Sequence, residues 1–357
     1  MSHGTSLTVR YVIALDVGST STGAALIARD GTLLDHTRRA SGREHGAEAV
    51  AESVLDFVAE LRDRGPHKYG EAARGVGVAV PGAVDEDRGL ALFSANPGWR
   101  DVPMRSSLSR TLQDLPFALG HDVRSAGLAE AGGLAEVRLG AARDKDRFLF
   151  ISLGDGIGGA VGTGGRIESG AHGFGGEFGH LRVRPGGRRC ACGAVGCLET
   201  VAGVPAIAEA WARASGDPTA TAVHAARAAA YGAPQAVRIW KEAVAALADA
   251  VVAGVGLRDP RTVVTGGELA AVGDILFVPL RTAIAERLTF QAPPEVVPAA
   301  LKGTAGCQGV GLLAWELLVP AVTTPCSLLV MLSNDLVDQR TWGELGWWNP
   351  AHRRLAS

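Results

Sequence analysis

The sequence predicts an α/β protein of two similar lobes, and three observations carry that prediction. Short apolar runs, typical of buried strands, alternate with longer runs that have helical spacing. Each half of the chain opens with a strand pattern, a glycine-bearing turn and a second strand pattern. The 357 residues, 47% of them hydrophobic, are enough for two domains with a substantial core. We therefore expect two α/β lobes around a cleft.

The first half of the chain is expected to form a sheet flanked by helices. The predicted strands are Tyr11–Asp16, Gly23–Ala28, Leu33–Arg39, Gly75–Val80 and Pro116–Leu119, and the predicted helices are Glu48–Arg64 and Met104–Leu112. Arg29-Asp30-Gly31 reads as a turn, and Pro81-Gly82 ends a strand. Asp122, a favoured N-cap residue, is expected to start a helix that runs to about Val137.

The second half repeats the opening pattern. The strand Phe148–Leu153 enters a loop over Gly154–Gly159, and a strand over Ala160–Thr163 follows. Helices are expected to dominate Val204–Leu257, and a strand over Thr262–Thr265 runs into Gly266-Gly267. The expected domains are a small lobe over 1–121, completed by a closing helix over 304–319 (Gly306–Leu318 in the helical pattern), a large lobe over 122–303, and a C-terminal extension over 320–357. The extension has little periodicity, and we expect it to be mobile or loosely docked.

The composition excludes several classes of partner and location. The formal charge of −2 gives no basic surface of the kind that nucleic acid requires. The start of the chain has no signal pattern, and no apolar run reaches the length of a membrane span. We therefore expect a cytoplasmic protein with no nucleic-acid or membrane partner. Five cysteines, three of them within eight positions, suit metal binding in a reducing compartment.

A zinc site is predicted by one cluster of residues. His180 is followed by Cys190, Cys192 and Cys197, a set of one imidazole and three thiolates that zinc binds in structural sites. Glycines between these residues allow the backbone to fold tightly around a small ion. The alternative is three buried structural cysteines and an unrelated histidine. Cys307 lies outside the cluster and reads as a buried thiol.

Three glycine loops at strand ends predict a nucleotide site. The first loop is Asp16-Val17-Gly18-Ser19-Thr20, in which Gly18 permits close backbone approach, Ser19 and Thr20 offer donors to phosphate oxygens, and Asp16 is placed to hold Mg²⁺. The others are Gly154-Asp155-Gly156 and Gly266-Gly267. Each loop alone could be a tight turn, but three in one α/β chain suggest a nucleotide held between two lobes.

From about Tyr11 to Leu318 the sequence resembles the ROK family of sugar kinases and sugar-responsive repressors. The most specific match is Gly176-Glu177-Phe178-Gly179-His180 followed by Cys190-Ala191-Cys192-Gly193-Ala194-Val195-Gly196-Cys197-Leu198-Glu199. Further matches are Asp16–Thr20, Pro81-Gly82, Asn96-Pro97-Gly98-Trp99, Asp122 and Val264-Thr265-Gly266-Gly267. The resemblance implies the actin-like, ribonuclease-H-like ATPase fold, with a sugar in the cleft, ATP with Mg²⁺ beside it, and a homodimer or homotetramer.

The resemblance also implies roles for individual residues. Asp122 matches the general base that takes the proton of the sugar 6-hydroxyl. Sugar hydroxyls are contacted by residues at the positions of His121, Glu177, His180, Glu199 and Asn96. His180 would also bind the structural zinc, so that the metal fixes one wall of the sugar pocket. On spacing alone, Asp122 could be only a helix N-cap and Glu199 only a solvated acid at a helix start.

The sequence departs from the family pattern at two positions. His121 stands where the family has Asn, and this leaves the substrate open between glucose, a related hexose and an amino-hexose. Asp155 stands where the family usually has Thr, and its carboxylate repels phosphate unless Mg²⁺ or a cationic group intervenes.

Three functions compete at this point. The first is an ATP-dependent hexose kinase. The second is a catalytically weak sugar-binding or sensing protein, which Asp155 keeps open. The third is a DNA-binding repressor, which is disfavoured because the first predicted strand begins near Tyr11 and leaves no room for a preceding DNA-binding domain.

Overall fold

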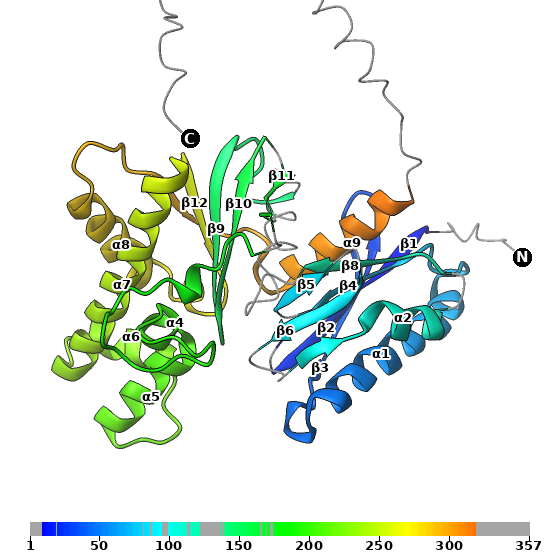
Figure 1. Cartoon of the computed structure of the whole chain (residues 1–357), viewed down its shortest axis with the longest axis horizontal. Helices are drawn as coiled ribbons and strands as arrows, with labels where there is room; N and C mark the ends of the chain where they lie inside the picture. The colour runs from blue at the N-terminus through cyan, green and yellow to red at the C-terminus, as the bar shows by residue number, and fades with distance from the viewer. Residues whose placement is uncertain are drawn as a thin grey trace, which may run out of the picture. The chain divides into compact units, whose positions relative to one another are not determined.

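The computed structural model of the chain is drawn in Figure 1, and its two main sheets have the same strand order. The structure describes residues 9–18, 20–80, 82–85, 88–94, 99–112, 115–121, 136, 139–164, 166–168, 170–171 and 174–318. All statements below concern these residues.

The first sheet has the order β3-β2-β1-β4-β8. Its strands are β1 (Tyr11–Val17), β2 (Ser21–Ala28), β3 (Leu33–Ala40), β4 (Val76–Val80) and β8 (Phe117–His121). The strands β1, β2 and β3 pair antiparallel, whereas β4 pairs parallel with both β1 and β8. The five strands predicted from the apolar runs are thus present, with ends that shift by one or two residues.

The second sheet repeats this topology with the order β11-β10-β9-β12-β13. Its strands are β9 (Arg147–Leu153), β10 (Ile157–Thr163), β11 (Arg166–Ile167), β12 (Thr262–Gly266) and β13 (Glu295–Pro298). Here too an antiparallel hairpin, β9–β10, is followed by parallel pairs, β9–β12 and β12–β13. The repeat seen in the sequence therefore extends to five strands in each half.

Helices of the described residues fall into two sets. Those that accompany the first sheet are α1 (Ala47–Tyr69), α2 (Met104–Leu112) and α9 (Ala305–Leu317). Those that accompany the second are α4 (Glu199–Ala202), α5 (Val204–Ser215), α6 (Ala222–Ala230), α7 (Pro234–Arg258) and α8 (Asp274–Arg287). Short 3₁₀ turns cover Arg43–His45, Phe178–His180, Leu269–Val272 and Lys302–Thr304.

Strand β1 is buried on both faces. Its side chains alternate between the two faces, and each face packs against different helices. Ile13 and Leu15 belong to a core cluster with residues of α1 and α2, whereas Val12 and Ala14 pack with Val310 of α9. Alternate residues of a strand point to opposite faces of the sheet, so Asp16 follows Val12 and Ala14 on the α9 face. The closing helix predicted from the sequence thus packs on the first sheet, although it is the last helix among the described residues.

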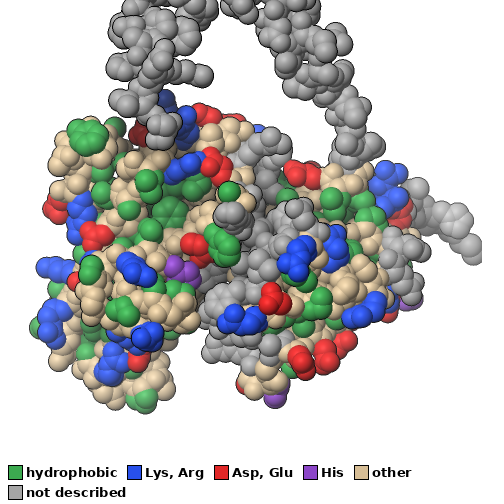
Figure 2. Space-filling model, in the orientation of Figure 1, with side chains coloured by type: hydrophobic (Ala, Val, Ile, Leu, Met, Phe, Trp, Pro, Cys, Tyr) green, Lys and Arg blue, Asp and Glu red, His purple; other side chains and the backbone are tan. Residues whose placement is uncertain are grey.

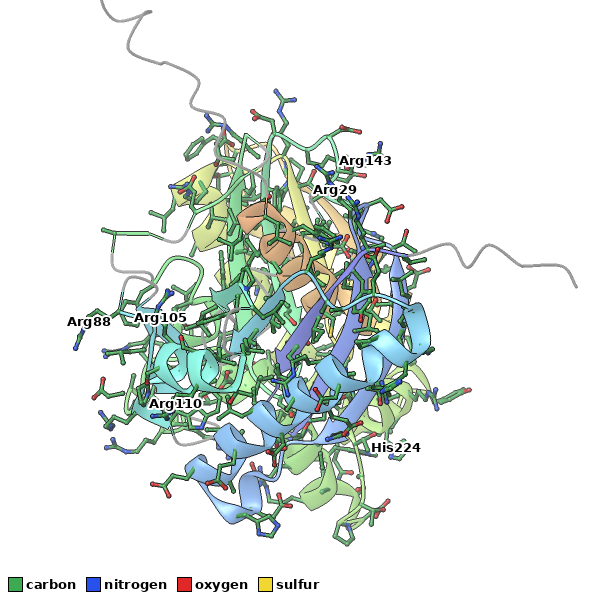
Figure 3. All side chains as sticks on the ribbon, turned by 90° about the vertical axis from the view of Figure 1, so that its right-hand side faces the viewer. Arg29, Arg88, Arg105, Arg110, Arg143 and His224 are labelled. Atoms are coloured by element: carbon green, nitrogen blue, oxygen red, sulfur yellow. The ribbon has the colours of Figure 1, made fainter. Side chains whose placement is uncertain are left out.

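One buried carboxylate joins the segment before β9 to the segment after β13. Glu136 is fully buried, and its Oε1 accepts a hydrogen bond of 2.8 Å from the Leu301 amide. Its other oxygen accepts from the Ala141 amide. Nearby, Gly31 in the β2–β3 turn lies against the Leu139 side chain. The labels Arg29 and Arg143 mark this region in Figure 3.

Several elements differ from the sequence-based prediction. Helix α1 extends to Tyr69, five residues beyond the predicted end, because it continues through Gly65 and Pro66 until Gly70 (φ 72°) ends it in a left-handed cap. Helix α8 and a third sheet, formed by β5 (Ala83–Asp85), β6 (Leu90–Ser94) and β7 (Trp99–Val102), were not predicted. The predicted helix after Asp122 and the extension over 320–357 lie outside the described residues, apart from Glu136 and Leu139, which are helical.

The packing of α9 yields a stability test at Gly77 of β4. A Cβ at Gly77 would lie 2.2 Å from the Val310 carbonyl oxygen, which is a backbone atom that cannot rotate away. We expect Gly77→Ala to lower the free energy of unfolding by about 1–3 kcal/mol, as overpacking does. The matched control is Gly256→Ala in α7, where a Cβ meets nothing within 4 Å and a helix-favouring residue is neutral or stabilising. Urea-induced unfolding measures the change in the free energy of unfolding for each variant. Equal changes for Gly77→Ala and Gly256→Ala would contradict the packing argument.

Candidate functional site

The β1–β2 turn is tight enough to require a glycine. The Gly18 amide donates a hydrogen bond of 2.9 Å to the Ser21 carbonyl, and a Cβ at Gly18 would lie 2.8 Å from that oxygen. Thr20 is exposed, and its carbonyl accepts a bond from the Ser41 amide in the segment after β3. Ser19 lies outside the described residues. The backbone here forms a compact loop of the kind that phosphate groups approach closely.

Asp16 is the buried acid of this loop. It is 4% exposed, and its Oδ1 has no hydrogen-bond partner among the described residues. Burial raises the pKa of its carboxyl to about 7, and the nearby charge of Arg38 partly opposes that rise. Arg38 lies in the same cross-strand row, since Asp16 pairs with Gly23 and Gly23 with Arg38. A buried, unsatisfied carboxylate oxygen fits a divalent cation such as Mg²⁺.

The second and third glycine loops lie side by side. Their strands β9 and β12 are parallel neighbours, with Gly266 opposite Ser152. Gly267 has φ 85°, and a Cβ there would lie 2.4 Å from the Leu153 carbonyl oxygen. The Gly154 amide donates to the Gly156 carbonyl at 3.0 Å. The structure thus brings two of the three predicted loops together at the carboxyl ends of parallel strands, where ligands of α/β sheets bind.

The Gly-Glu-Phe-Gly-His motif is explained by its packing against β10. A Cβ at Gly176 would lie 2.2 Å from the Gly159 carbonyl oxygen, and one at Gly179 would lie 2.1 Å from that of Ile157. Phe178, between them, is 6% exposed and joins the large core cluster. Because the glycines approach the strand and the phenylalanine enters the core, the two remaining side chains, Glu177 and His180, are held in a fixed relation to β10.

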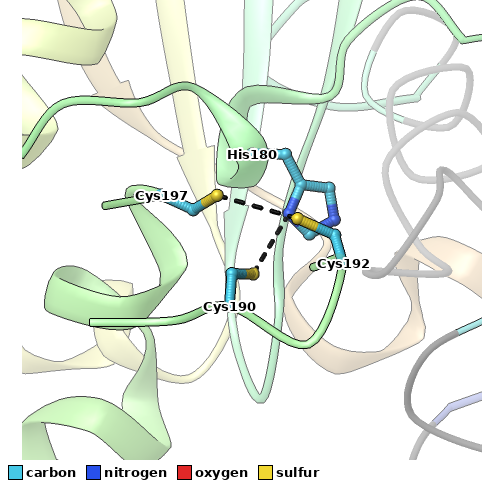
Figure 4. Close-up of side chains that lie close together, drawn as sticks. All are labelled: His180, Cys190, Cys192 and Cys197. Carbon is cyan, nitrogen blue, oxygen red and sulfur yellow. Dashed lines mark hydrogen bonds between the residues drawn. The ribbon is translucent and has the colours of Figure 1, made fainter. Parts of the chain in front are cut away.

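His180 and the three clustered cysteines converge, as Figure 4 shows. Their potential ligand atoms all lie within 4.8 Å of one another. The Cys190 Sγ lies 3.6 Å from the His180 Nδ1, and the Cys192 Sγ lies 3.7 Å from the Cys197 Sγ. With Zn–S near 2.3 Å and Zn–N near 2.0–2.1 Å, a tetrahedral site separates sulfur from nitrogen by about 3.6 Å and sulfur from sulfur by about 3.8 Å. The donor set and spacing are therefore compatible with structural zinc.

Protonation of these ligands is set by their burial. Burial raises the pKa of the Cys197 thiol to about 12 and raises that of Cys190. It lowers the pKa of His180, which favours the neutral imidazole, the form that binds a metal. A bound cation would displace the thiol protons and offset the desolvation of the thiolates. The His180 Nε2 lies 3.7 Å from a carboxylate oxygen of Glu177, which places an acid behind the imidazole.

Glu199 links the cysteine loop to the same strand. It is the first residue of α4, and its Oε2 accepts a hydrogen bond of 2.9 Å from the Ile157 amide. Burial raises the pKa of its carboxyl, and that hydrogen bond opposes the rise. The structure thus brings Glu177, His180 and Glu199 to one end of β10. A solvated acid at a helix start, the alternative reading of Glu199, does not describe this half-buried, hydrogen-bonded side chain.

A cavity of about 210 Å³ joins this region to the second glycine loop. It is lined by residues of that loop, of the cysteine loop and of α4 and α5: Asp155, Arg188, Arg189, Cys190, Ala191, Glu199, Thr200, Pro205, Ala206 and Glu209. Asp155, which departs from the family pattern, therefore shares a cavity with Glu199. The sequence analysis did not single out the arginines, although the loop carries four of them between positions 182 and 189.

Another arginine of this loop anchors it to the helices behind. Arg184 Nη1 donates to Asp249 of α7 at 2.6 Å, and its Nε donates to Glu242 of the same helix. Asp249 also accepts a bond of 2.6 Å from Arg287 of α8. The three elements are thus held by one half-buried charge network. Such long-range pairs have no local sequence signal, because partners 65 positions apart are brought together only by the fold.

Three predicted site residues are not placed by the structure. Asp122, Asn96 and Ser19 lie outside the described residues. His121 is the last residue of β8, and only its backbone is described. Their roles remain predictions.

The topology is that of the actin-like ATPase fold, and it carries a Cys₃His cluster. The sequence model of the ROK family matches residues 12–316, and the chain belongs to that family. The resemblance inferred from the motifs is confirmed, and so is the fold class.

Relatives of known name are matched over most of their length. A glucokinase of Thermotoga maritima is 33% identical over 321 residues, which cover 85% of this chain and 97% of the relative. A kanosamine kinase of Amycolatopsis mediterranei is 32% identical over 306 residues, which cover 85% and 96%. The crystal structure of a ROK family glucokinase from Streptomyces griseus in complex with glucose and AMPPNP has a TM-score of 0.74 and 27% identity, covering 86% of this chain and 99% of that one. These comparisons support classing the chain as a sugar kinase.

Two surface properties complete the description. None of the helices among the described residues has both the length and the apolar character needed to cross a bilayer. On the face drawn in Figure 2, basic and acidic side chains of the described residues are interspersed. This mixture agrees with the formal charge of −2.

The cysteine cluster predicts the effect of losing one ligand. We expect Cys192→Ser to lower two quantities together, the zinc content, expected at one ion per chain, and the affinity for glucose. Each should fall by roughly tenfold or more, because the cluster holds His180 and Glu199 in place. Cys307→Ser, which removes a buried thiol outside the cluster, is the matched control. Metal analysis and calorimetric titration with glucose measure the two quantities. Loss of zinc with unchanged glucose affinity would show that the ion only stabilises the fold.

Proposed function

We propose that the chain is an ATP-dependent sugar kinase that transfers the γ-phosphoryl group to the 6-hydroxyl of a hexose. The observation that carries this proposal is the convergence of Glu177, His180 and Glu199 at one end of β10, beside two glycine loops. Carboxylates and an imidazole accept hydrogen bonds from sugar hydroxyls in fixed directions. Glycine loops at strand ends accept the phosphates of a nucleotide. The family membership and the sugar kinases among the relatives agree with this combination.

Roles within the site follow from the chemistry of phosphoryl transfer, which depends on positioning and on charge neutralisation. Asp122 acts as the general base toward the 6-hydroxyl. Glu177, His180 and Glu199 orient the sugar, together with Asn96 and His121. The loops that contain Gly18, Ser19, Thr20, Gly154, Gly156, Gly266 and Gly267 hold the phosphates. Mg²⁺ bound with ATP supplies positive charge near the phosphates, and Asp16 is the residue that would hold it.

The proposal includes the organisation of the chain. The small lobe comprises residues 1–121 and is completed by the closing helix over 304–319, a division supported by the packing of α9 on β1 and β4. The large lobe covers 122–303 and carries the zinc loop over 180–199. A homodimer or homotetramer is expected from the family.

The second candidate function is sugar binding without efficient transfer, and the acidic Asp155 in the second glycine loop favours it. A kinase assay separates the two. We expect ADP release that depends on a hexose, and Asp122→Asn should lower kcat by about 10²- to 10⁴-fold, the contribution of a general base. Sugar affinity measured by calorimetry should change little in that variant. Tight hexose binding with no ADP release above the Asp122→Asn background for any hexose would favour the sugar-binding protein.

The identity of the hexose is a separate question. His121 replaces the family's Asn and lies at the end of β8, and the relatives include a kanosamine kinase. We therefore expect an amino-hexose to be phosphorylated with a higher kcat/KM than glucose. Steady-state kinetics on glucose, mannose, 2-amino- and 3-amino-glucose test this order. A clear preference for glucose would contradict the amino-hexose assignment and leave the kinase proposal intact.

A further inference from the structure

The chain passes twice between the elements of its two main sheets. The first crossing, residues 122–146, runs from β8 to β9, and the second, residues 299–304, runs from β13 to α9. Residues 136 and 139–146 of the first crossing and all of the second are described. The hydrogen bond from the Leu301 amide to the Glu136 carboxylate therefore joins one crossing to the other.

The Glu136 carboxylate serves one backbone amide with each of its oxygens. Oε1 accepts from the Leu301 amide at 2.8 Å, and Oε2 accepts from the Ala141 amide on its own crossing. The side chain is fully buried, and a Cβ at Gly140 would lie 2.1 Å from Oε2. An ionised carboxylate accepts at both oxygens, whereas a glutamine amide has one acceptor and one donor group. Glutamine at this position could therefore serve only one of the two amides.

Further contacts close a ring around this carboxylate. The Thr304 Oγ1 lies 2.9 Å from the Leu301 carbonyl oxygen and 3.0 Å from the Gln308 Oε1. The Gln308 Nε2 donates a hydrogen bond of 3.2 Å to the Gly31 carbonyl in the β2–β3 turn. The first crossing packs on the same turn, because a Cβ at Gly31 would lie 2.6 Å from the Leu139 Cδ1. The two crossings and a turn of the first sheet thus form one connected set of contacts.

Both crossings adjoin the elements that carry the glycine loops. The first enters β9, which ends at the second glycine loop. The second begins beside the third loop, since a Cβ at Gly266 would lie 3.1 Å from the Ala299 Cβ. It then enters the first turn of α9, where the Cys307 Sγ lies 3.3 Å from the place of a Cβ at Gly23, the residue that pairs with Asp16. The segments joined by this carboxylate therefore reach all three loops.

We propose that Glu136 is a positioning residue of the nucleotide site, which fixes the loop of Asp16 relative to the two glycine loops of the second sheet. This inference rests on the proposed kinase function. Because the side chain is fully buried, it acts through the backbone amides that it binds. A nucleotide that contacts loops of both sheets binds more tightly when their spacing is already set, since binding then does not have to order them.

The test measures binding of Mg–ADP to the purified full chain by calorimetry. Glu136→Gln keeps the shape of the side chain but releases one amide, and it should weaken Mg–ADP binding by about tenfold. The matched control is Glu295→Gln, which removes a carboxylate that bonds Lys145 of the first crossing to β13, within the second sheet. This control should bind Mg–ADP like the parent chain.

Two further measurements separate positioning from a loss of folded protein. A partly unfolded variant lowers the calorimetric stoichiometry, whereas a misplaced loop lowers the affinity of every folded chain. Amide hydrogen exchange over residues 299–304 should accelerate in Glu136→Gln and stay at the parent rate in Glu295→Gln. Thr304→Val removes the hydroxyl of the ring at nearly constant shape, and it decides the test in the same way if Glu136→Gln does not fold.

The outcomes distinguish this inference from the kinase proposal. Equal Mg–ADP affinities for Glu136→Gln and Glu295→Gln, or a fall in stoichiometry at unchanged affinity, would overturn the inference. A parent chain that binds no Mg–ADP would overturn both proposals. The kinase is judged separately by ADP release. A chain whose Mg–ADP affinity depends on Glu136 but that phosphorylates no hexose would reject the kinase and leave this inference standing.

Discussion

The start of β10 positions both segments of the candidate site, the one that carries Glu177 and His180 and the one that carries Glu199. The Ile157 carbonyl lies where a side chain at position 179 would collide with it, so the segment that carries Glu177 and His180 approaches the strand through glycines. The Ile157 amide donates to Glu199, the acid that follows the last cysteine of the cluster. Two segments about 20 positions apart are therefore both positioned by contacts with one residue of a buried strand, Ile157. The positions of Glu177, His180 and Glu199 therefore depend on the sheet.

A metal bound by the cluster would add a constraint to a loop that backbone hydrogen bonds already shape. Residues 185–189 between the ligands are exposed and rich in glycine and arginine, and they belong to no helix or strand. A tetrahedral ion would fix His180 at one end of this segment and Cys197 at the other. The Arg184 network ties the same segment to α7 and α8. The ion pairs of Arg184 restrain this loop, and a bound ion would restrain it further, as expected of a loop that positions a site.

Much of the fold and part of the site could be predicted from the sequence, for identifiable physical reasons. Strands β1, β4 and β9 are buried on both faces, so each reads as a continuous apolar run. The cysteine cluster is local, and its spacing alone indicated a metal site. By contrast, β5, β6 and β7 are short, and no periodic pattern of apolar residues in the sequence predicts how they pair. Helix α8 contains Pro279, which weakens the helical pattern.

The electrostatic partners of the site were beyond prediction for a different reason. Asp155 could be identified as a departure from the family pattern, but the side chains that share its pocket could not be named. Arg189 is 34 positions away, on a loop whose path is set by the cysteines and by the packing of Gly196 against the Arg184 carbonyl. A loop shaped by the cysteine cluster therefore also brings two arginines to a pocket that it shares with the second glycine loop. Because a substitution in either loop changes the charge that lines this pocket, the effects of substitutions in the two loops need not be additive.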